Sequence, residues 1–370
     1  MKVAICGDPL LALHVQTGLK NNGVECKFFI KGFVSEANER ELDANFSLIN
    51  FFDCRKMIKR GELDTVIVAD KTAYSNFTKD VVQFLKLYEI PQVAVMDFGW
   101  HNPVYMLDSD KAFLPYLETS IIDYCNLSCE GCVDFAALFG KKDIYPLERF
   151  RRDVRQISKH CDLMIFHIFG GEPLLLKNLD EYIRVARQYL PKTHIAIVTN
   201  GLLIPSLPQK ILDAIRETDC RIEISAYAPA LKIIDKIKAV LISNKIRFLI
   251  NPRDEFVVFL TLHNGNDPEK ARVGCLSDIC RFLRDGKIYK CQANALKYRF
   301  EEYFGIDKLP EPVGIDIFAP NFPALIPMLD GNVEMCHWCS DKPRQIPWKT
   351  GVKTKLENWL ADPDEAKNLL

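Results

Sequence analysis

The chain has 370 residues, 48% of them hydrophobic, and its 48 Lys and Arg residues almost balance its 49 Asp and Glu residues. This composition is enough for one large core or two moderate ones, and the balanced charge argues against a broadly basic nucleic-acid-binding surface. No apolar run approaches the roughly 18 residues of a membrane span, and Asp8 and Pro9 interrupt the apolar start, which favours a first strand over a secretory signal.

The first part of the chain alternates short β-like runs with helical patterns. The expected strands are 1–6, 24–30, 63–70 and 91–98, and the expected helices are 10–23 and 81–89. This alternation predicts a small Rossmann-like parallel α/β domain over residues 1–112, for substrate docking, dimerisation or binding of a nucleotide-linked substrate. The first strand-to-helix turn, CGDPLLAL, lacks the glycine spacing of a dinucleotide fingerprint, so NAD binding is not supported.

A second α/β series follows, over residues 113–262. Its expected strands are 119–124, 162–169, 194–201, 221–228, 245–250 and 256–260, and its expected helices are 146–160, 179–190, 208–218 and 231–244. About six β/α units in succession predict a partial (β/α)6 barrel. Loops at the carboxyl ends of its strands would then build the site.

Three cysteines follow the first of these strands directly. Cys125, Cys129 and Cys132 form a C-x3-C-x2-C run. Three thiolates at this spacing can hold three corners of a cubane iron–sulfur cluster and leave the fourth iron open to another ligand. The alternative is a zinc site, which would need a fourth ligand such as His101 or Asp123.

The next two strands end in loops that could hold a ligand against such an iron. Gly170 and Gly171 allow close backbone approach, Glu172 can accept a hydrogen bond from an ammonium group, and Pro173 stiffens the exit. The run Thr199-Asn200-Gly201 ends the third strand, and Ser225 lies within the fourth. A zinc site would leave both loops unexplained.

The last segment, residues 263–370, has more proline, fewer long helical patterns and a group of five cysteines: Cys275, Cys280, Cys291, Cys336 and Cys339. Asp285-Gly286 predicts a turn inside it, between a helix-like run and the strand 287–291. The odd total of 13 cysteines and the long helical patterns elsewhere argue against a secreted disulfide scaffold. We therefore expect a cytoplasmic protein that uses its thiols for metal.

The ordered set CNLSCEGC, GGEP and TNG resembles the radical S-adenosylmethionine (SAM) superfamily over residues of about 118–260. The resemblance implies a [4Fe–4S] cluster on the three cysteines, whose open iron chelates the amino and carboxylate groups of SAM. It also implies that Glu172, with its glycines and Pro173, binds the SAM amino group, and that Asn200 and Ser225 lie near the ribose or carboxylate. The chain departs from many members at Gly131, where they have an aromatic residue.

The tail cysteines resemble the twitch module of the SPASM/twitch radical SAM enzymes. This resemblance implies one auxiliary [4Fe–4S] cluster on Cys275, Cys291, Cys336 and Cys339, with Cys280 as an alternative ligand. A zinc ribbon is the competing interpretation, because C-x2-C is a common zinc-binding pair.

The family resemblance implies an oxidoreductase that cleaves SAM reductively to a 5′-deoxyadenosyl radical, which abstracts a hydrogen atom. We expect a small-molecule substrate, a sugar, aminosugar or nucleotide-linked glycan precursor, that is oxidised or epimerised. A flavodoxin or ferredoxin would be the reductant, and no nucleic-acid or membrane partner is expected. The alternatives are a peptide or protein maturase and a non-catalytic metal-binding scaffold. No substrate base is assigned; Tyr227, His263, Arg253 and Asp254 are candidates by position only.

Overall fold

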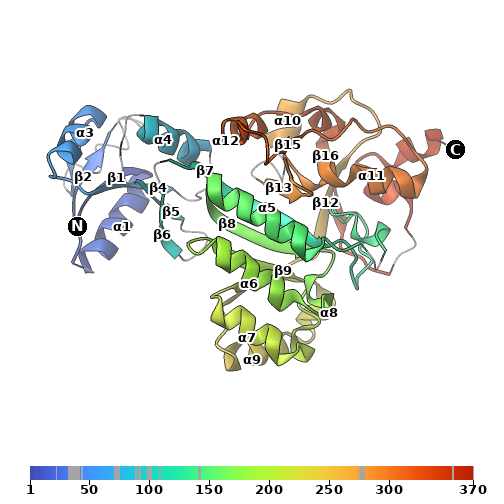
Figure 1. Cartoon of the computed structure of the whole chain (residues 1–370). Coiled ribbons are helices and arrows are strands. Elements are labelled where there is room, and N and C mark those ends of the chain that lie inside the picture. Colours follow the sequence, from blue (N-terminus) through green and yellow to red (C-terminus); the bar gives the residue numbers. More distant parts are fainter. Residues whose placement is uncertain are drawn as a thin grey trace. The chain divides into compact units, whose positions relative to one another are not determined.

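The computed structural model describes residues 1–21, 23–31, 42, 45–70, 76–87, 90, 93–97, 102–107, 110–140, 143–273, 275, 280–351 and 354–369. The chain divides into two compact units. The first is Met1–Pro115 with His160–Met164, and the second is Tyr116–Lys159 with Ile165–Leu370. Figure 1 labels their helices and strands.

The first unit is a parallel α/β structure. Its elements are β1 (Lys2–Gly7), α1 (Pro9–Asn21), β2 (Glu25–Ile30), β3 (Ser47–Ile49), α3 (Phe51–Lys59), β4 (Thr65–Asp70), α4 (Asn76–Leu87), β5 (Val93–Asp97) and β6 (Asn102–Met106). The sheet order is β3-β2-β1-β4-β5-β6, with parallel pairing except between β5 and β6. The expected strands and helices are confirmed. The sequence analysis missed β3, α3 and β6, and the three residues of β3 are too few to show a periodicity.

The backbone of β4 packs closely against the turn from β1 to α1. A Cβ atom on Gly7 would lie 2.1 Å from the Ala69 carbonyl oxygen, so only glycine fits there. The Asp8 carboxylate then accepts hydrogen bonds from the backbone N–H groups of Leu10 and Leu11 at 3.0 and 3.1 Å. The first N–H groups of α1 are therefore capped by an acidic side chain.

The second unit is built on an eight-stranded sheet in the order β11-β10-β9-β8-β7-β13-β14-β15. Its first part comprises β7 (Ala112–Ile122), α5 (Leu147–His160), β8 (Cys161–Gly170), α6 (Leu179–Tyr189), β9 (His194–Thr199), α7 (Gln209–Glu217), β10 (Arg221–Ala226), α8 (Ala228–Leu231), α9 (Ile234–Ser243) and β11 (Phe248–Pro252). Strands β8, β9, β10 and β11 pair in parallel. Helix α5 buries Phe150, Val154 and Ile157, which share one helical face. In Figure 1, α5 and α6 lie along the strands of this sheet.

The expected sixth parallel strand does not join this sheet. Only two residues separate the end of β11 at Pro252 from the start of strand β12 (Glu255–Leu260). A parallel neighbour would need a crossover connection of about a dozen residues or more, which this link cannot supply. Instead β12 pairs antiparallel with β16 (Cys339–Pro347).

The tail continues the eight-stranded sheet. Its elements are α10 (Pro268–Val273), β13 (Phe282–Arg284), β14 (Lys287–Tyr289), α11 (Gln292–Phe304), β15 (Gly314–Asp316) and α12 (Phe322–Leu325). The expected turn is confirmed, since Asp285 and Gly286 have φ values of 47° and 79°. The segment before it is strand β13, not the expected helix-like run, and it pairs antiparallel with β14. Strand β13 of this hairpin pairs in parallel with β7, and Phe282 lies opposite Glu118. The unexpected helix α11 packs Leu296 and Phe300 into the core.

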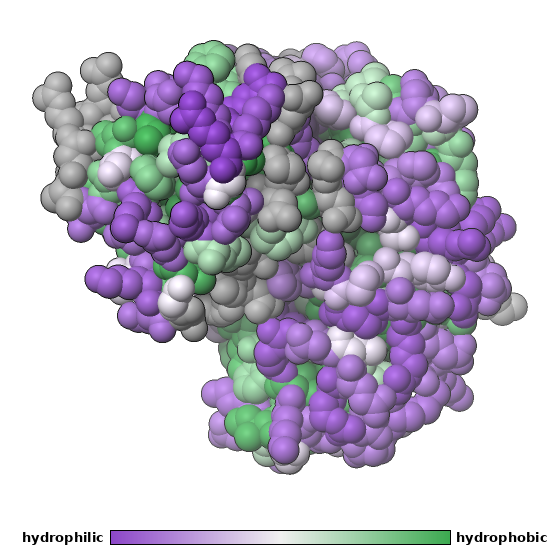
Figure 2. Space-filling model, turned by 60° about the vertical axis from the view of Figure 1, so that its left-hand side comes forward, coloured by the Kyte–Doolittle hydropathy of each residue, from purple (hydrophilic) through white to green (hydrophobic). Residues whose placement is uncertain are grey.

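Hydrophilic residues dominate the surface visible in Figure 2, and hydrophobic residues appear there in separate patches. Among the described residues, no helix combines the length and the apolar character that a membrane crossing requires.

Candidate functional site

A pocket opens at the carboxyl ends of the central strands. Its wall contains seven of the residues that the sequence analysis selected: Cys125, Cys129, Cys132, Gly170, Gly171, Asn200 and Ser225. These residues come from the loop after β7, the end of β8 and the loop after it, the loop after β9, and strand β10 itself. Because parallel strands end at one edge of a sheet, segments far apart in sequence meet here.

The glycine loop fits closely against the chain that leads to the cysteines. A Cβ atom on Gly170 would lie 2.0 Å from the Ile122 carbonyl oxygen, and one on Gly171 would lie 2.2 Å from the Tyr124 carbonyl carbon. The Gly171 N–H donates to the Ile122 oxygen at 2.7 Å, and the Glu172 N–H donates to the Tyr124 oxygen at 3.1 Å. The two glycines are therefore required by close backbone packing.

Glu172 lies behind the pocket wall. Its carboxylate is fully buried and accepts hydrogen bonds from Leu174 N at 3.0 Å, Thr199 Oγ1 at 2.7 Å and Asn200 N at 2.9 Å. Burial raises the pKa of Glu172 to about 7, although these three donors act to lower it. Pro173 is also buried, at the start of a short 3-10 turn. Glu172 therefore joins the GGEP loop to the TNG loop, and the glycines form the pocket wall.

Asn200 connects the TNG loop to the cysteine loop. Its Nδ2 donates to Asn126 Oδ1 at 2.8 Å and lies 3.9 Å from Cys125 Sγ, while its Oδ1 accepts from Leu202 N at 3.1 Å. Ser225 and Tyr227 bring the end of β10 into the same pocket. Both amide ends of Asn200 are thus fixed, and the thiol of Cys125 has an amide group beside it.

The three thiols of the triplet are placed for metal binding. Burial is the largest cause that raises the pKa of Cys125 to about 12, and it also raises the pKa of Cys129 and Cys132. Iron must therefore displace a proton from each sulfur as it binds. The backbone N–H of Leu127 and the Trp348 indole N–H each lie 3.3 Å from a sulfur, that of Cys125 and Cys129 respectively. Such donors stabilise the charge of bound thiolates, so these residues fit a cluster.

Asp134 is a pocket residue that the sequence analysis missed. It lies in the wall with the three cysteines, and its buried Oδ1 has no hydrogen-bond partner among the described residues. Burial, together with the nearby Asp123, raises the pKa of Asp134 to about 7. In the sequence, only its position two residues after Cys132 indicated that Asp134 could lie near the site. A buried acceptor without a partner calls for an explanation, such as a bound ligand or water.

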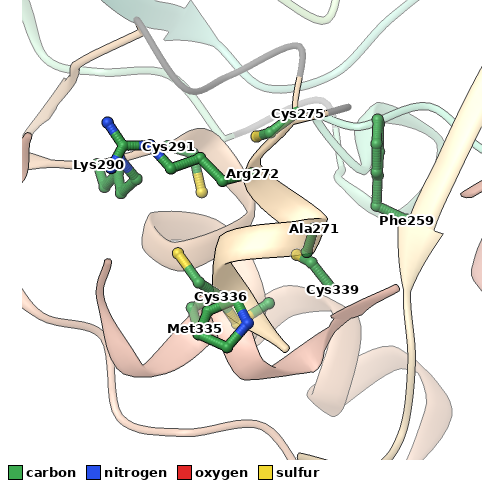
Figure 3. Close-up of a pocket in the computed structure, with 10 residues that line it drawn as sticks. Phe259, Ala271, Arg272, Cys275, Lys290, Cys291, Met335, Cys336 and Cys339 are labelled. Carbon is green, nitrogen blue, oxygen red and sulfur yellow. The ribbon is translucent and has the colours of Figure 1, made fainter. Parts of the chain in front are cut away.

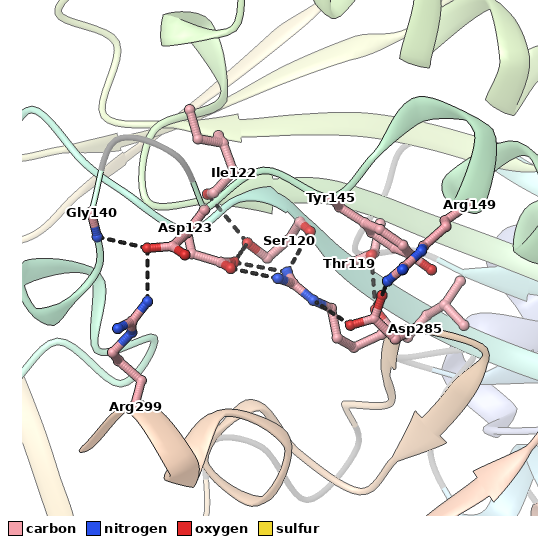
Figure 4. A network of polar contacts seen from close by, with 12 residues as sticks. Thr119, Ser120, Ile122, Asp123, Gly140, Tyr145, Arg149, Asp285 and Arg299 are labelled. Atoms are coloured by element: carbon pink, nitrogen blue, oxygen red, sulfur yellow. Dashed lines mark hydrogen bonds and ion pairs between the residues drawn. The ribbon is translucent and has the colours of Figure 1, made fainter. Parts of the chain in front are cut away.

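Asp123, a conceivable zinc ligand, has other partners. It accepts hydrogen bonds from Arg284 and from Ser120, in the network of Figure 4. His101, the other conceivable zinc ligand, lies outside the described residues. Of the four residues proposed by position, Tyr227 lies in the pocket wall and Arg253, Asp254 and His263 do not. His263 instead lies 3.4 Å from Glu365.

Four tail cysteines surround a second pocket. Cys275, Cys291, Cys336 and Cys339 line it, and Figure 3 shows their sulfur atoms turned toward the space between them. Burial raises the pKa of Cys291 to about 12 and that of Cys339 well above its usual value. Lys290 and Arg272 also line this pocket and add positive charge beside the sulfurs. Four thiols around one enclosed space fit a four-cysteine cluster.

Cys280 is the fifth tail cysteine and is not part of that wall. Its thiol is a hydrogen-bond partner of the buried Glu118 carboxyl, which also contacts Gln292 and Tyr116. Within the described ranges, no three His, Cys, Asp or Glu side chains converge on a single-ion site. A cubane cluster gives each cysteine a different iron, so its ligands surround a space instead of meeting at one point.

Residues 119–256 match the sequence model of the Radical SAM superfamily. The GTP 3′,8-cyclase of Sulfurimonas denitrificans is 30% identical over 111 residues, and that of Alkaliphilus metalliredigens is 33% identical over 111 residues. Each match covers 30% of this chain and 34% of the relative, so the chain spans about a third of the length of these curated relatives.

Solved structures also resemble parts of the chain. BtrN in complex with AdoMet and 2-DOIA has a TM-score of 0.37 and 18% identity, and the match covers 62% of this chain and 94% of BtrN. Streptococcus suis SuiB bound to S-adenosylmethionine has a TM-score of 0.35 and 13% identity, and the match covers 79% of this chain and 77% of SuiB.

Proposed function

We propose that this chain, whose residues 119–256 match the Radical SAM superfamily model, is an enzyme that cleaves SAM at the triplet pocket and abstracts a hydrogen atom from a small-molecule substrate. The observation that carries this proposal is the shared wall of the pocket. The three thiols, the two glycines and Asn200 line one space at the carboxyl ends of the strands. A metal-binding scaffold would need the thiols but not the two loops.

Each part of the wall has a task in this proposal. Cys125, Cys129 and Cys132 hold the [4Fe–4S] cluster. The backbone of Gly170 and Gly171 approaches the amino-acid part of SAM, and Asn200 and Ser225 form hydrogen bonds to its carboxylate or ribose. Glu172 positions the two loops relative to each other through its three hydrogen bonds. When bound, the cluster and SAM together supply the electron and the 5′-deoxyadenosyl radical that removes a hydrogen atom.

Asp134 is the candidate for contact with the substrate. Asp134 lies in the pocket wall, and its Oδ1, which has no partner among the described residues, could accept a hydrogen bond from a hydroxyl or amino group. Substrate binding would then satisfy a buried acceptor that is otherwise costly to leave unpaired. This favours a polar small molecule such as a sugar or aminosugar.

The tail cysteines extend the proposal to a second cofactor. We assign one auxiliary [4Fe–4S] cluster to Cys275, Cys291, Cys336 and Cys339, and a hydrogen-bonding role beside Glu118 to Cys280. Residues 263–370 would then form a twitch/SPASM-like module next to a partial barrel of residues 113–262. An auxiliary cluster could accept an electron from a substrate radical, which favours oxidation, and epimerisation is the other outcome that we propose.

The substrate class is a sugar, an aminosugar or a nucleotide-linked glycan precursor. The relatives named GTP 3′,8-cyclase agree with a nucleotide-bearing small molecule, but they match only part of the radical SAM domain. Residues 1–112 form a Rossmann-like domain in this proposal and serve in substrate docking or dimerisation. The electron donor would be a flavodoxin or ferredoxin. A peptide or protein substrate is the alternative.

The central test is SAM cleavage. Protein reconstituted anaerobically with iron and sulfide should release 5′-deoxyadenosine from SAM after reduction with dithionite. Replacement of Cys125, Cys129 and Cys132 by alanine should abolish this release. Cys220→Ala is the matched control, because Cys220 is buried before β10 and belongs to neither pocket. Continued cleavage by the triple variant would contradict the proposal.

Product analysis then separates the outcomes. Incubation with a panel of nucleotide sugars in deuterated water should give either an oxidised sugar, with one 5′-deoxyadenosine per turnover, or an epimer with deuterium at one carbon. Turnover of a peptide in place of any sugar would support the maturase alternative.

A further inference from the structure

A short segment near the C-terminal end lies against the cysteine loop. We call residues 348–351 the strap. The Glu130 N–H donates to the Lys349 oxygen at 3.1 Å, and the Gly351 N–H donates to the Ser128 oxygen at 3.1 Å. Cys129 and Thr350 face each other as an antiparallel bridge. The strap therefore pairs with the loop like a short strand and fixes the position of the middle cysteine of the triplet.

The side chain of Trp348 reaches the sulfur of that cysteine. Its indole Nε1 donates to Cys129 Sγ at 3.3 Å. The indole stacks on Tyr227 with a centroid separation of 5.0 Å and an interplanar angle of 13°. Its backbone N–H donates to the Asp254 oxygen at 2.7 Å. Backbone and ring are thus both held, so the N–H group is aimed at the sulfur by the surrounding structure.

Gly131 lets strands β12 and β16 pack closely against the cysteine loop. A Cβ atom at Gly131 would lie 2.8 Å from Val258 Cγ2 and 2.9 Å from Ile346 Cδ1, which belong to β12 and β16. Any larger residue would push this pair of strands away from the loop. Gly131 therefore provides the room that the strap's approach requires.

An N–H group aimed at a metal-bound thiolate stabilises negative charge on the sulfur. A reduced iron–sulfur cluster carries one more negative charge than an oxidised one, so the bond is stronger in the reduced state. Hydrogen bonds to cluster sulfurs are accordingly among the factors that set reduction potentials. The hydroxyl of Thr350 accepts a hydrogen bond from the backbone N–H of Ser128 at 3.1 Å, so this side chain holds the loop beside Cys129.

We propose that Trp348 is a positioning residue that raises the reduction potential of the SAM-binding cluster through its N–H bond to Cys129. The inference rests on the proposed function, because it requires a cluster on the triplet. A higher potential lets a physiological reductant populate the state that delivers the electron to SAM. The strap also continues directly from β16, which begins at Cys339 of the tail pocket. One strand therefore links the tail cysteines to the residue that tunes the first cluster.

The test is a redox titration of the reconstituted full chain, followed by electron paramagnetic resonance. The signal to follow is the one that changes when SAM is added, because only the cluster with the open iron binds SAM. Trp348→Phe retains an aromatic ring against Tyr227 and removes the N–H. We expect the ratio of reduced to oxidised cluster at a fixed potential to fall at least about threefold, which is a shift of about 30 mV to lower potential for one electron.

Trp359→Phe is the matched control. The Trp359 indole also donates to the cysteine loop, but to the backbone oxygen of Cys132 at 3.0 Å. Its replacement removes a bond to the loop without removing a bond to sulfur, so the potential should stay at the wild-type value. Thr350→Val removes the hydroxyl that accepts from Ser128 N and leaves the Trp348 indole in place, so it should likewise leave the potential at the wild-type value.

Two results would overturn the inference while the proposed function stands: an unchanged potential in Trp348→Phe, or equal shifts in Trp348→Phe and Trp359→Phe. The second result would mean that loop structure, not the bond to sulfur, sets the potential. If the wild-type protein gives no signal that responds to SAM, the proposed function itself fails, and the inference fails with it.

Discussion

Arg284 holds the carboxylate of Asp123 through two hydrogen bonds, from Nη1 to Oδ1 at 2.9 Å and from Nη2 to Oδ2 at 2.6 Å. The two side chains are 13% and 1% exposed. Arg284 ends β13 in the tail, and Asp123 lies two residues before Cys125. The tail hairpin therefore supports the start of the cysteine loop. Figure 4 labels Asp123 and Asp285, the turn residue that follows Arg284.

We predict that Arg284→Ala destabilises the protein by about 3–5 kcal/mol, because it leaves the Asp123 charge buried without its partner. Arg149→Ala is the control in the same network. The side chains of Arg149 and Asp285 are 59% and 50% exposed, so this ion pair should contribute about 1 kcal/mol or less to the free energy of unfolding. Urea unfolding of the two variants measures the difference. Equal losses would contradict the special role of the buried pair.

Gly171→Ala should abolish SAM binding, because its Cβ would collide with the backbone of Tyr124 at 2.2 Å and displace the loop. Gly331→Ala is the control, since its nearest contact would be an ordinary 3.8 Å to the Met328 oxygen. Isothermal titration of reconstituted protein with SAM measures both. Wild-type affinity in Gly171→Ala would show that the loop can move without loss of the site.

Replacing a cysteine of the tail pocket and replacing Cys280 should have different effects on the iron content of the protein. With two [4Fe–4S] clusters, the wild-type protein should contain about eight irons per chain. Cys291→Ala should lower this to about four, because Cys291 lines the tail pocket, and Cys280→Ala should leave it near eight. Iron and zinc analysis of the purified variants provides the measurement. Zinc at one equivalent in the wild type would favour the zinc ribbon instead.

His167 should make stability depend on pH. Burial lowers its pKa from 6.5 to about 3, so the folded protein binds fewer protons than the unfolded chain between these values. Stability from this group is therefore present above pH 6.5 and lost as the pH falls toward 3, by at most about 1.4 kcal/mol per pH unit. Glu118 acts in the opposite direction, because burial raises its pKa to about 8.

His167→Gln isolates this contribution, since Glu118 is present in both proteins. The apparent melting temperature should fall less between pH 7 and pH 5.5 in the variant than in the wild type. Parallel curves for the two proteins would mean that His167 is not the group that titrates.

The local signals in the sequence were sufficient for much of the fold and for the family. The alternation of strands and helices, the Asp285-Gly286 turn and the order of CNLSCEGC, GGEP and TNG each depend on residues close together in the chain. The predicted radical SAM domain is confirmed by the match over residues 119–256. The helix α11 was missed because its buried face, with Leu296 and Phe300, forms only against other parts of the core.

The sequence by itself determined the presence of three cysteines before the GGEP and TNG loops and of a second cysteine group in the tail. Tertiary structure decided which cysteines share a pocket, that the Glu172 carboxylate turns inward, and that β12 leaves the parallel sheet. It also brought Trp348 to Cys129 across 219 positions. Such contacts depend on how whole strands pack, and a spacing of residue types along the chain carries no record of them.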